Sequence, residues 1–166
     1  MGESGAPEHF RRSPIKGEVE HMFLGQYQHN LDNKGRLTIP SRYRDLLEQG
    51  AYVTRGFDSN LMVWTVTAFE TISKSVNRMS ITDPNSRLLR RLIYASGEKV
   101  DVDRVGRILI PQFLRQSAGL DGEVVIVGVG DYFEIWSPPT WSQQLADLQD
   151  GDANIRRFEA FDLATG

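Results

Sequence analysis

The chain contains no cysteine, which excludes disulfide bonds and thiolate chemistry. Its three histidines, at positions 9, 21 and 29, are too few and too scattered to predict a zinc site. No apolar run reaches the roughly 18 residues that a membrane-spanning helix needs, and residues 1–21 lack the apolar core of a signal peptide. No nucleophile–base pair or nucleophile-elbow motif stands out. We therefore expect a cytoplasmic protein that is not an enzyme and has no cofactor, metal, membrane partner or small-molecule substrate.

Neither sign of charge dominates the chain, since the net charge is only −3. Acidic residues are concentrated near the two ends, whereas residues 32–44 hold Lys34, Arg36, Arg42 and Arg44 against the single acid Asp32. A phosphate backbone responds to such local patches rather than to the total charge. The weakly negative total therefore does not exclude a nucleic-acid partner.

Helical patterns separate two strand-rich stretches, and residues 1–21 are polar and unpatterned, as in a flexible N-terminal extension. The run Thr67-Ala-Phe-Glu70 has the form of a capping box with Thr67 as the N-cap, and Asp83-Pro84 predicts the start of a second helix. Ser137-Pro-Pro predicts a last helix, and residues 150–166 are acidic and weakly patterned, as in a loose tail or an interface segment.

The strongest organisational signal is an internal duplication. Asp32-Asn-Lys-Gly-Arg-Leu-Thr-Ile-Pro40 aligns with Asp103-Arg-Val-Gly-Arg-Ile-Leu-Ile-Pro111, and further along Arg44 meets Arg115 and Trp64 meets Trp136. Two copies with helices between them predict a pseudo-twofold α+β unit rather than a solenoid.

Each copy of the motif predicts a hairpin tip that presents an arginine. Asp32 and Asp103 would accept backbone N–H bonds, and Gly35 and Gly106 would supply the left-handed residue of a bulged turn. Arg36 and Arg107 would then leave the base of the tip, with Lys34 or Arg104 nearer the apex. Guanidinium groups held in this way suit phosphate or base edges. An ordinary surface hairpin with an internal ion pair is the alternative, and the recurrence of the arginine favours the first interpretation.

These residues resemble a known family. Met22-Phe-Leu-Gly-Gln-Tyr27 and Leu31-Asp-Asn-Lys-Gly-Arg-Leu-Thr-Ile-Pro-Ser-Arg-Tyr-Arg44 resemble the start of MraZ proteins, and Asp103-Arg-Val-Gly-Arg107 resembles their second Asp-x-x-x-Arg motif. One motif alone would indicate only the wider AbrB/SpoVT-like group. The resemblance covers about residues 22–148, so residues 1–21 are additional.

The resemblance implies a DNA-binding transcriptional regulator made of two tandem swapped-hairpin, AbrB-like β-barrel units. Residues 26–68 and 97–140 would form the units, residues 69–96 a connecting helical pair, and residues 141–166 a C-terminal helix and acidic tail. A homo-oligomeric ring would bind short direct repeats of double-stranded DNA upstream of the division and cell-wall gene cluster, acting as a repressor at the nucleoid. By motif matching, the DNA-contacting residues would be Lys34, Arg36, Arg104 and Arg107, with Asp32, Gly35, Asp103 and Gly106 ordering the loops.

Three alternatives remain open from the sequence. An AbrB-like antitoxin would bind both DNA and a toxin protein, and the tail at residues 145–166 is the only candidate docking segment. An enzyme on a related duplicated barrel would need a polar catalytic constellation, which is lacking. A purely structural ring protein would not bind DNA at any salt concentration.

Overall fold

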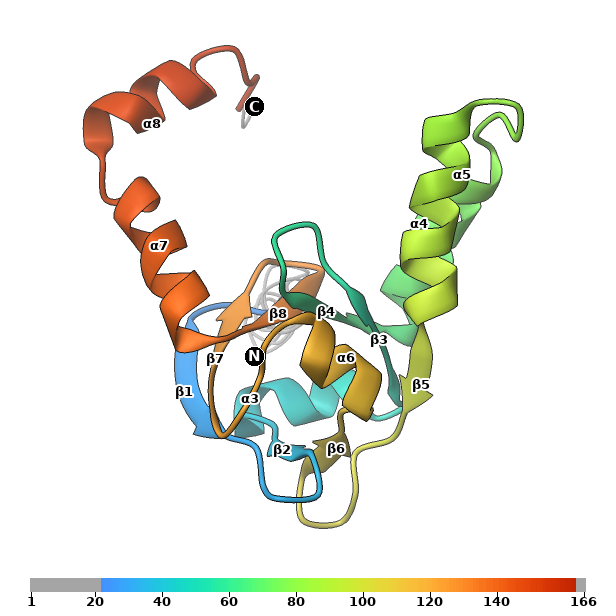
Figure 1. Ribbon diagram of the computed structural model, residues 1–166, viewed down its shortest axis with the longest axis vertical. Helices are drawn as coiled ribbons and strands as arrows, with labels where there is room; N and C mark the ends of the chain where they lie inside the picture. The colour runs from blue at the N-terminus through green and yellow to red at the C-terminus, as the bar shows by residue number, and fades with distance from the viewer. Residues whose placement is uncertain (1–21, 164–166) are drawn as a thin grey trace, which may run out of the picture.

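The computed structural model describes residues 22–163, so the extension predicted at residues 1–21 lies outside the described residues. The fold is mixed α+β, as the sequence predicts. A six-stranded antiparallel sheet has the order β1-β7-β8-β4-β3-β5, and β2 and β6 form a separate two-stranded ribbon (Figure 1). The strands are β1 (Gln26–Asn30), β2 (Arg36–Thr38), β3 (Ala51–Arg55), β4 (Leu61–Thr65), β5 (Glu98–Val100), β6 (Arg107–Leu109), β7 (Glu123–Gly128) and β8 (Tyr132–Trp136).

The two sequence repeats are interleaved in space. β1 of the first repeat pairs with β7 of the second, and β5 of the second pairs with β3 of the first. The equivalent strands β4 and β8 pair with each other at the centre of the sheet, and the equivalent strands β2 and β6 do the same in the ribbon. The sheet order is therefore symmetric about the β4–β8 pair, as a pseudo-twofold relation requires. Neither repeat has a complete sheet without strands from the other.

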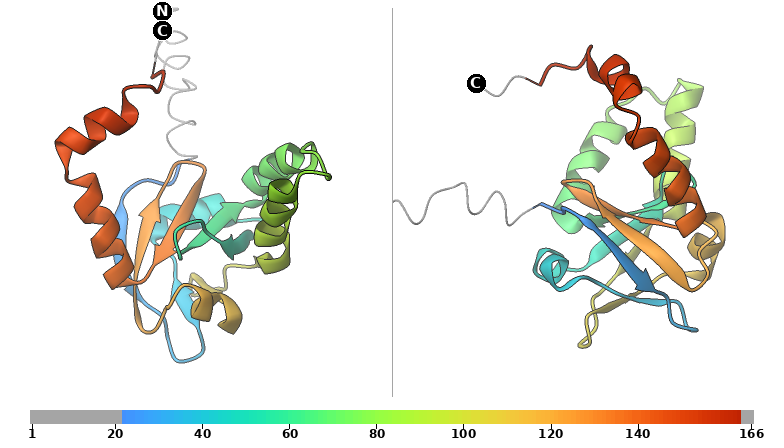
Figure 2. Two further views of the ribbon diagram at one scale, coloured as in Figure 1. Left: turned by 45° about the horizontal axis from the view of Figure 1, so that its top comes forward. Right: turned by 90° about the vertical axis from the view of Figure 1, so that its left-hand side faces the viewer.

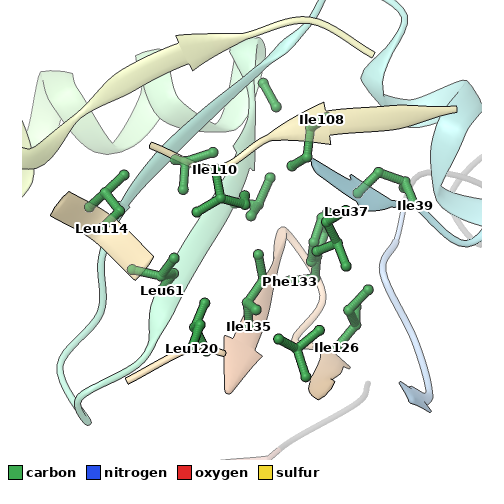
Figure 3. Close-up of a cluster of buried hydrophobic side chains, with 14 of the residues drawn as sticks. Leu37, Ile39, Leu61, Ile108, Ile110, Leu114, Leu120, Ile126, Phe133 and Ile135 are labelled. Atoms are coloured by element: carbon green, nitrogen blue, oxygen red, sulfur yellow. The ribbon is translucent and has the colours of Figure 1, made fainter. Parts of the chain in front are cut away.

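The hydrophobic core lies between the ribbon and the sheet and draws on both repeats (Figure 3). Leu37 of β2 lies opposite Ile108 of β6 in the register, and both side chains are almost fully buried. Side chains alternate along a strand, so the neighbouring Arg36 and Arg107 are only partly buried. Across the core, Phe133 of β8 is fully buried. The segments that carry the predicted tips are thus anchored on shared apolar packing.

The helices fall into two projections and two short connectors. They are α3 (Ser41–Arg44) with the 3₁₀ turn η2 (Asp45–Leu47), α4 (Val66–Asn77), α5 (Pro84–Arg90) with the π-helical turn η3 (Arg91–Ala95), α6 (Gln112–Ser117), α7 (Pro138–Leu148) and α8 (Gly151–Phe158). Two helical arms, α4–α5 and α7–α8, project from one end of the molecule (Figures 1 and 2). The loops that precede β2 and β6 project from the opposite end, away from both arms.

The structure confirms one helix start and corrects another. Asp83 caps α5 as predicted, since its side chain accepts from the N–H of Asn85, with Pro84 at the first helical position. The capping box with Thr67 as the N-cap is wrong: Thr65 caps α4 by accepting from the N–H of Ala68. The reason is that β4 runs directly into α4 at Thr65, which places Thr67 already inside the helix.

The C-terminal segment is also more ordered than its composition indicates. α7 begins at Pro138 with Ser137 as its N-cap, and a further helix, α8, occupies much of the segment predicted as a loose tail. Asp150 caps α8 by accepting from the N–H of Ala153. Arg156 and Arg157 lie in its last turn, where positive charge interacts favourably with the helix dipole.

Candidate nucleic-acid interface

The first tip comprises residues 32–36 and is ordered by one carboxylate. Asp32 Oδ1 accepts hydrogen bonds from the backbone N–H groups of Lys34 (2.9 Å) and Arg36 (2.8 Å), and Asp32 Oδ2 accepts from Arg36 Nε (2.7 Å). Backbone bonds from Gly35 N–H to Asp32 O and from Asp32 N–H to Arg36 O close the turn, with Gly35 at a φ of +84°. Such a left-handed residue is normally glycine.

The second tip comprises residues 103–107 and repeats this geometry. Asp103 Oδ1 accepts from the N–H groups of Val105 and Arg107, each at 2.9 Å, and Asp103 Oδ2 accepts from Arg107 Nε at 2.9 Å. Gly106 has a φ of +91°. The same chemistry therefore holds both tips, even though an exposed Val105 stands where the first tip has Lys34.

The tip carboxylates are held in the charged state. The backbone N–H of Arg36 is the main cause that lowers the pKa of Asp32 from its ordinary 3.8 to about 2, and the guanidinium of Arg36 adds to it. The backbone N–H of Arg107 likewise lowers the pKa of Asp103. Both aspartates are consequently ionised near neutral pH and pair with their arginines.

Each arginine at a tip uses only part of its guanidinium for the turn. Nε of Arg36 and of Arg107 donates to the aspartate, and within residues 22–163 no hydrogen bond involves their Nη atoms. The side chains are 33% and 27% exposed, so neither arginine is in the core. Lys34 and Arg104 are exposed nearer the apices. All four predicted DNA-contacting side chains thus lie on the two tips, with Nη groups or an ammonium available to a partner.

The two tips are joined to each other rather than being independent hairpins. Ile39 N–H donates to Gly106 O, and Ile110 N–H donates to Gly35 O, both at 2.8 Å. These symmetric bonds extend the β2–β6 ribbon to the turn glycines. The relative placement of the tips is therefore set by backbone hydrogen bonds between the repeats.

Two further arginines brace the tips across the repeats, a role that the sequence pattern did not predict. Arg44 Nε donates to Ile39 O and Arg115 Nε donates to Ile110 O, each at 2.9 Å. A Cβ atom on Gly106 would collide with Cζ of Arg44, and one on Gly35 would lie 2.7 Å from Cζ of Arg115. Each guanidinium therefore packs on the turn glycine of the opposite repeat. The equivalence of Arg44 and Arg115 in the duplication was the signal that could have indicated a shared role.

Metal clusters and membrane-spanning helices are two features that the described part of the chain lacks. Residues 22–163 contain no group of three or more His, Asp or Glu side chains placed to hold a metal ion. None of the helices among these residues is long and apolar enough to cross a membrane.

Comparison with known proteins agrees with the motif and the duplication. A family model described as "MraZ protein, putative antitoxin-like" matches the chain twice, over residues 22–92 and 93–160. Curated proteins called transcriptional regulator MraZ are similar over most of their length. The protein from Roseiflexus castenholzii is 43% identical over 137 residues, which cover 82% of this chain and 94% of the relative. The protein from Thermomicrobium roseum is 43% identical over 123 residues, which cover 74% and 87%.

The double match accounts for nearly all of the described chain, and each match includes one of the two tips. The chain belongs to the MraZ family of transcriptional regulators.

Proposed function

We propose that this protein is a sequence-specific regulator that grips double-stranded DNA with its two arginine-bearing tips. The observation that carries the proposal is the pair of identical Asp–Arg locks, which leave the Nη atoms of Arg36 and Arg107 available at one end of the molecule. Lys34 and Arg104 add positive charge beside them. Cations held in this way can contact phosphates or the edge of guanine.

The locks favour binding because they fix the arginines in advance. A free arginine side chain loses rotamer freedom when it binds, which weakens the interaction. In each tip the Nε–carboxylate bond and the bulged turn have already restricted the side chain. The guanidinium therefore meets DNA with little further ordering.

A ring of subunits would multiply these contacts. The arms carry exposed apolar side chains: Met79, Ile81 and Leu88 on α4–α5, and Leu148, Ile155 and Phe158 on α7–α8. Contact between the α4–α5 arm of one copy and the α7–α8 arm of the next would be head-to-tail, which generates a ring when the rotation closes. Several tips on tandem direct repeats would then gain an avidity of about 10²–10⁴ over one subunit.

The finer architecture and the regulatory setting belong to the same proposal. The exchange of β1 and β5 between the repeats is what two swapped-hairpin units at residues 26–68 and 97–140 would give, with residues 69–96 as the connection. From the family resemblance, the operator is a set of short direct repeats upstream of the division and cell-wall gene cluster, and the protein represses it at the cytoplasmic nucleoid.

An antitoxin is the second candidate function. The words "antitoxin-like" in the description of the matching family favour it, as does the exposed apolar side chain of Phe158 on α8. Such a protein would use the tips for DNA and the C-terminal arm for a toxin protein. Co-expression with the product of a neighbouring gene would reveal a stable heteromeric complex, which a simple promoter regulator would not form.

The test is a fluorescence-anisotropy titration with DNA from upstream of the protein's own gene, over a series of salt concentrations. We expect Arg36→Ala and Arg107→Ala each to weaken binding and to flatten the salt dependence, by about 0.9 in logarithmic slope for each lost phosphate contact. Reducing the operator to one repeat should also weaken binding sharply. Unchanged affinity in the double arginine variant would refute the proposed interface.

A further inference from the structure

A second cationic surface lies outside the tips, in a groove between β1 and α3. The groove has a volume of about 550 Å³. It is lined by Tyr27 and His29 of β1, by Ile39 and Pro40 after β2, and by Ser41, Arg42 and Arg44 of α3. No carboxylate among residues 22–163 lines it. Arg42 is exposed, and no hydrogen bond or ion pair of its side chain is found within residues 22–163. The groove therefore offers guanidinium, imidazole and hydroxyl donors with no competing acid.

Arg44 connects this groove to the second tip. Its Nε donates to Ile39 O at 2.9 Å, and its guanidinium packs against Gly106, the turn glycine of residues 103–107. The Nη atoms of Arg44 make no hydrogen bond with the described residues. A strand of DNA that contacts Arg104 and Arg107 would thus meet the groove as a continuation of the same positive surface.

The pseudo-twofold relation provides an internal comparison, because the equivalent positions beside the first tip have different chemistry. In the alignment that pairs Asp32 with Asp103, Tyr27 corresponds to Glu98, His29 to Val100, and Arg42 to Phe113. Glu98 and Phe113 are both exposed. Only Arg115, the counterpart of Arg44, remains cationic. The equivalent surface beside the first tip therefore has one cationic side chain and an exposed carboxylate, which makes it a poorer match for an anion.

The two tips carry equal positive charge, so the surfaces beside them make the difference between the repeats. The first tip has Lys34 and Arg36, and the second has Arg104 and Arg107. Arg42 and His29 supply further donors beside the second tip. The two repeats would then hold DNA by different sets of contacts despite their common backbone.

We propose that the groove formed by Tyr27, His29, Ser41, Arg42 and Arg44 is a phosphate-binding subsite that takes the DNA backbone beside the second tip. The inference rests on the proposed function, since it assumes that the tips meet DNA. It also predicts that each subunit binds DNA in one preferred orientation, because only one of the two tips has such a subsite. A phosphodiester of the duplex is the intended occupant, and free inorganic phosphate is the other source of the same chemistry.

The test compares variants in which the full-length protein is titrated with its upstream DNA at several salt concentrations. Arg42→Gln should weaken binding about two- to fivefold, the size of an exposed ion pair, and reduce the salt slope by about 0.9 for each subunit engaged. Arg55→Gln, at an exposed arginine of β3, should leave both quantities unchanged. The exchange of Glu98→Tyr and Val100→His with Phe113→Arg should reproduce the chemistry of the groove beside the first tip and steepen the slope by a similar amount.

The outcomes separate this inference from the proposed function. An unchanged affinity and slope in Arg42→Gln, together with a large loss in Arg36→Ala, would overturn the groove and leave the tips in place. A loss in neither variant would overturn both. Inorganic phosphate is titrated separately at constant ionic strength, with nuclear magnetic resonance signals of the protein as the readout. Saturable shifts at His29 and Arg42, with DNA affinity unaffected by Arg42→Gln, would identify a free-phosphate site and reject the DNA subsite.

Discussion

Replacing Arg36 with lysine keeps a positive charge on the first tip and removes the forked shape of the guanidinium. In the structure, Arg36 Nε donates to Asp32 Oδ2 at 2.7 Å while the Nη atoms remain available. A lysine has a single nitrogen, which cannot both reach Asp32 in this geometry and form a bidentate contact with DNA. The substitution therefore separates charge from shape at one position.

The magnitude follows from the number of bonds that are lost. One bidentate contact to a base contributes about 1–3 kcal/mol, so Arg36→Lys should weaken specific binding by about 5- to 150-fold. The salt slope should stay nearly constant because the charge is retained. Anisotropy titrations with operator and scrambled DNA measure both quantities, and Arg55→Lys on β3 is the matched control. Operator binding by Arg36→Lys within twofold of the unsubstituted protein would show that the fork is unimportant and refute the reasoning.

Three further predictions concern the scaffold of the tips. Leu37→Ala should reduce the free energy of unfolding by about 2–5 kcal/mol. Urea unfolding should remain a single transition because both repeats share the core. Two separate transitions would contradict this shared core. The ionised Asp32 stabilises the fold fully above its ordinary pKa of 3.8, and this stability should be lost as the pH falls through about 2. In urea titrations, Asp32→Asn should flatten that part of the profile of stability against pH. Identical profiles for the two proteins would rule out a stabilising Asp32–Arg36 pair. Gly106→Ala should destabilise the protein more than Gly119→Ala, because Gly119 also has a positive φ but has no atom within 4 Å of its added Cβ. In thermal unfolding, adding Arg44→Ala to Gly106→Ala should restore part of the lost stability. No recovery would exclude the clash with Arg44.

The turn geometry was predictable from the sequence because its causes are local. An aspartate reaches backbone N–H groups two and four residues ahead, and a glycine adopts the left-handed conformation, whatever the rest of the chain does. The duplication then presents the same Asp, Gly and Arg pattern a second time at residues 103–107. The start of α5 was predictable for the same reason, since Asp83 and Pro84 act within one turn of helix.

Features that depend on tertiary pairing could not be derived from local sequence patterns, and only the family resemblance implied an exchange of strands. Nothing in the composition of β1 indicates that it pairs with β7 rather than with a strand of its own repeat. The packing of Arg44 on Gly106 depends on the pairing of β2 with β6, which also joins distant parts of the chain. The choice of Thr65 over Thr67 as the cap of α4 was decided by where β4 ends. The acidic composition of residues 150–166 did not indicate that Asp150 would act as the N-cap of a helix, α8.

The pairing of β1 with β7 also constrains how the chain can mature. Its partner residues are separated by about a hundred positions, so β1 leaves the ribosome long before the strand that completes it has been synthesised. Contacts between such distant segments slow folding and leave an unpaired edge open to other chains. Nascent copies on one messenger RNA would expose β1 next to one another during this interval. The six-stranded sheet can therefore be completed only after the second repeat has emerged from the ribosome.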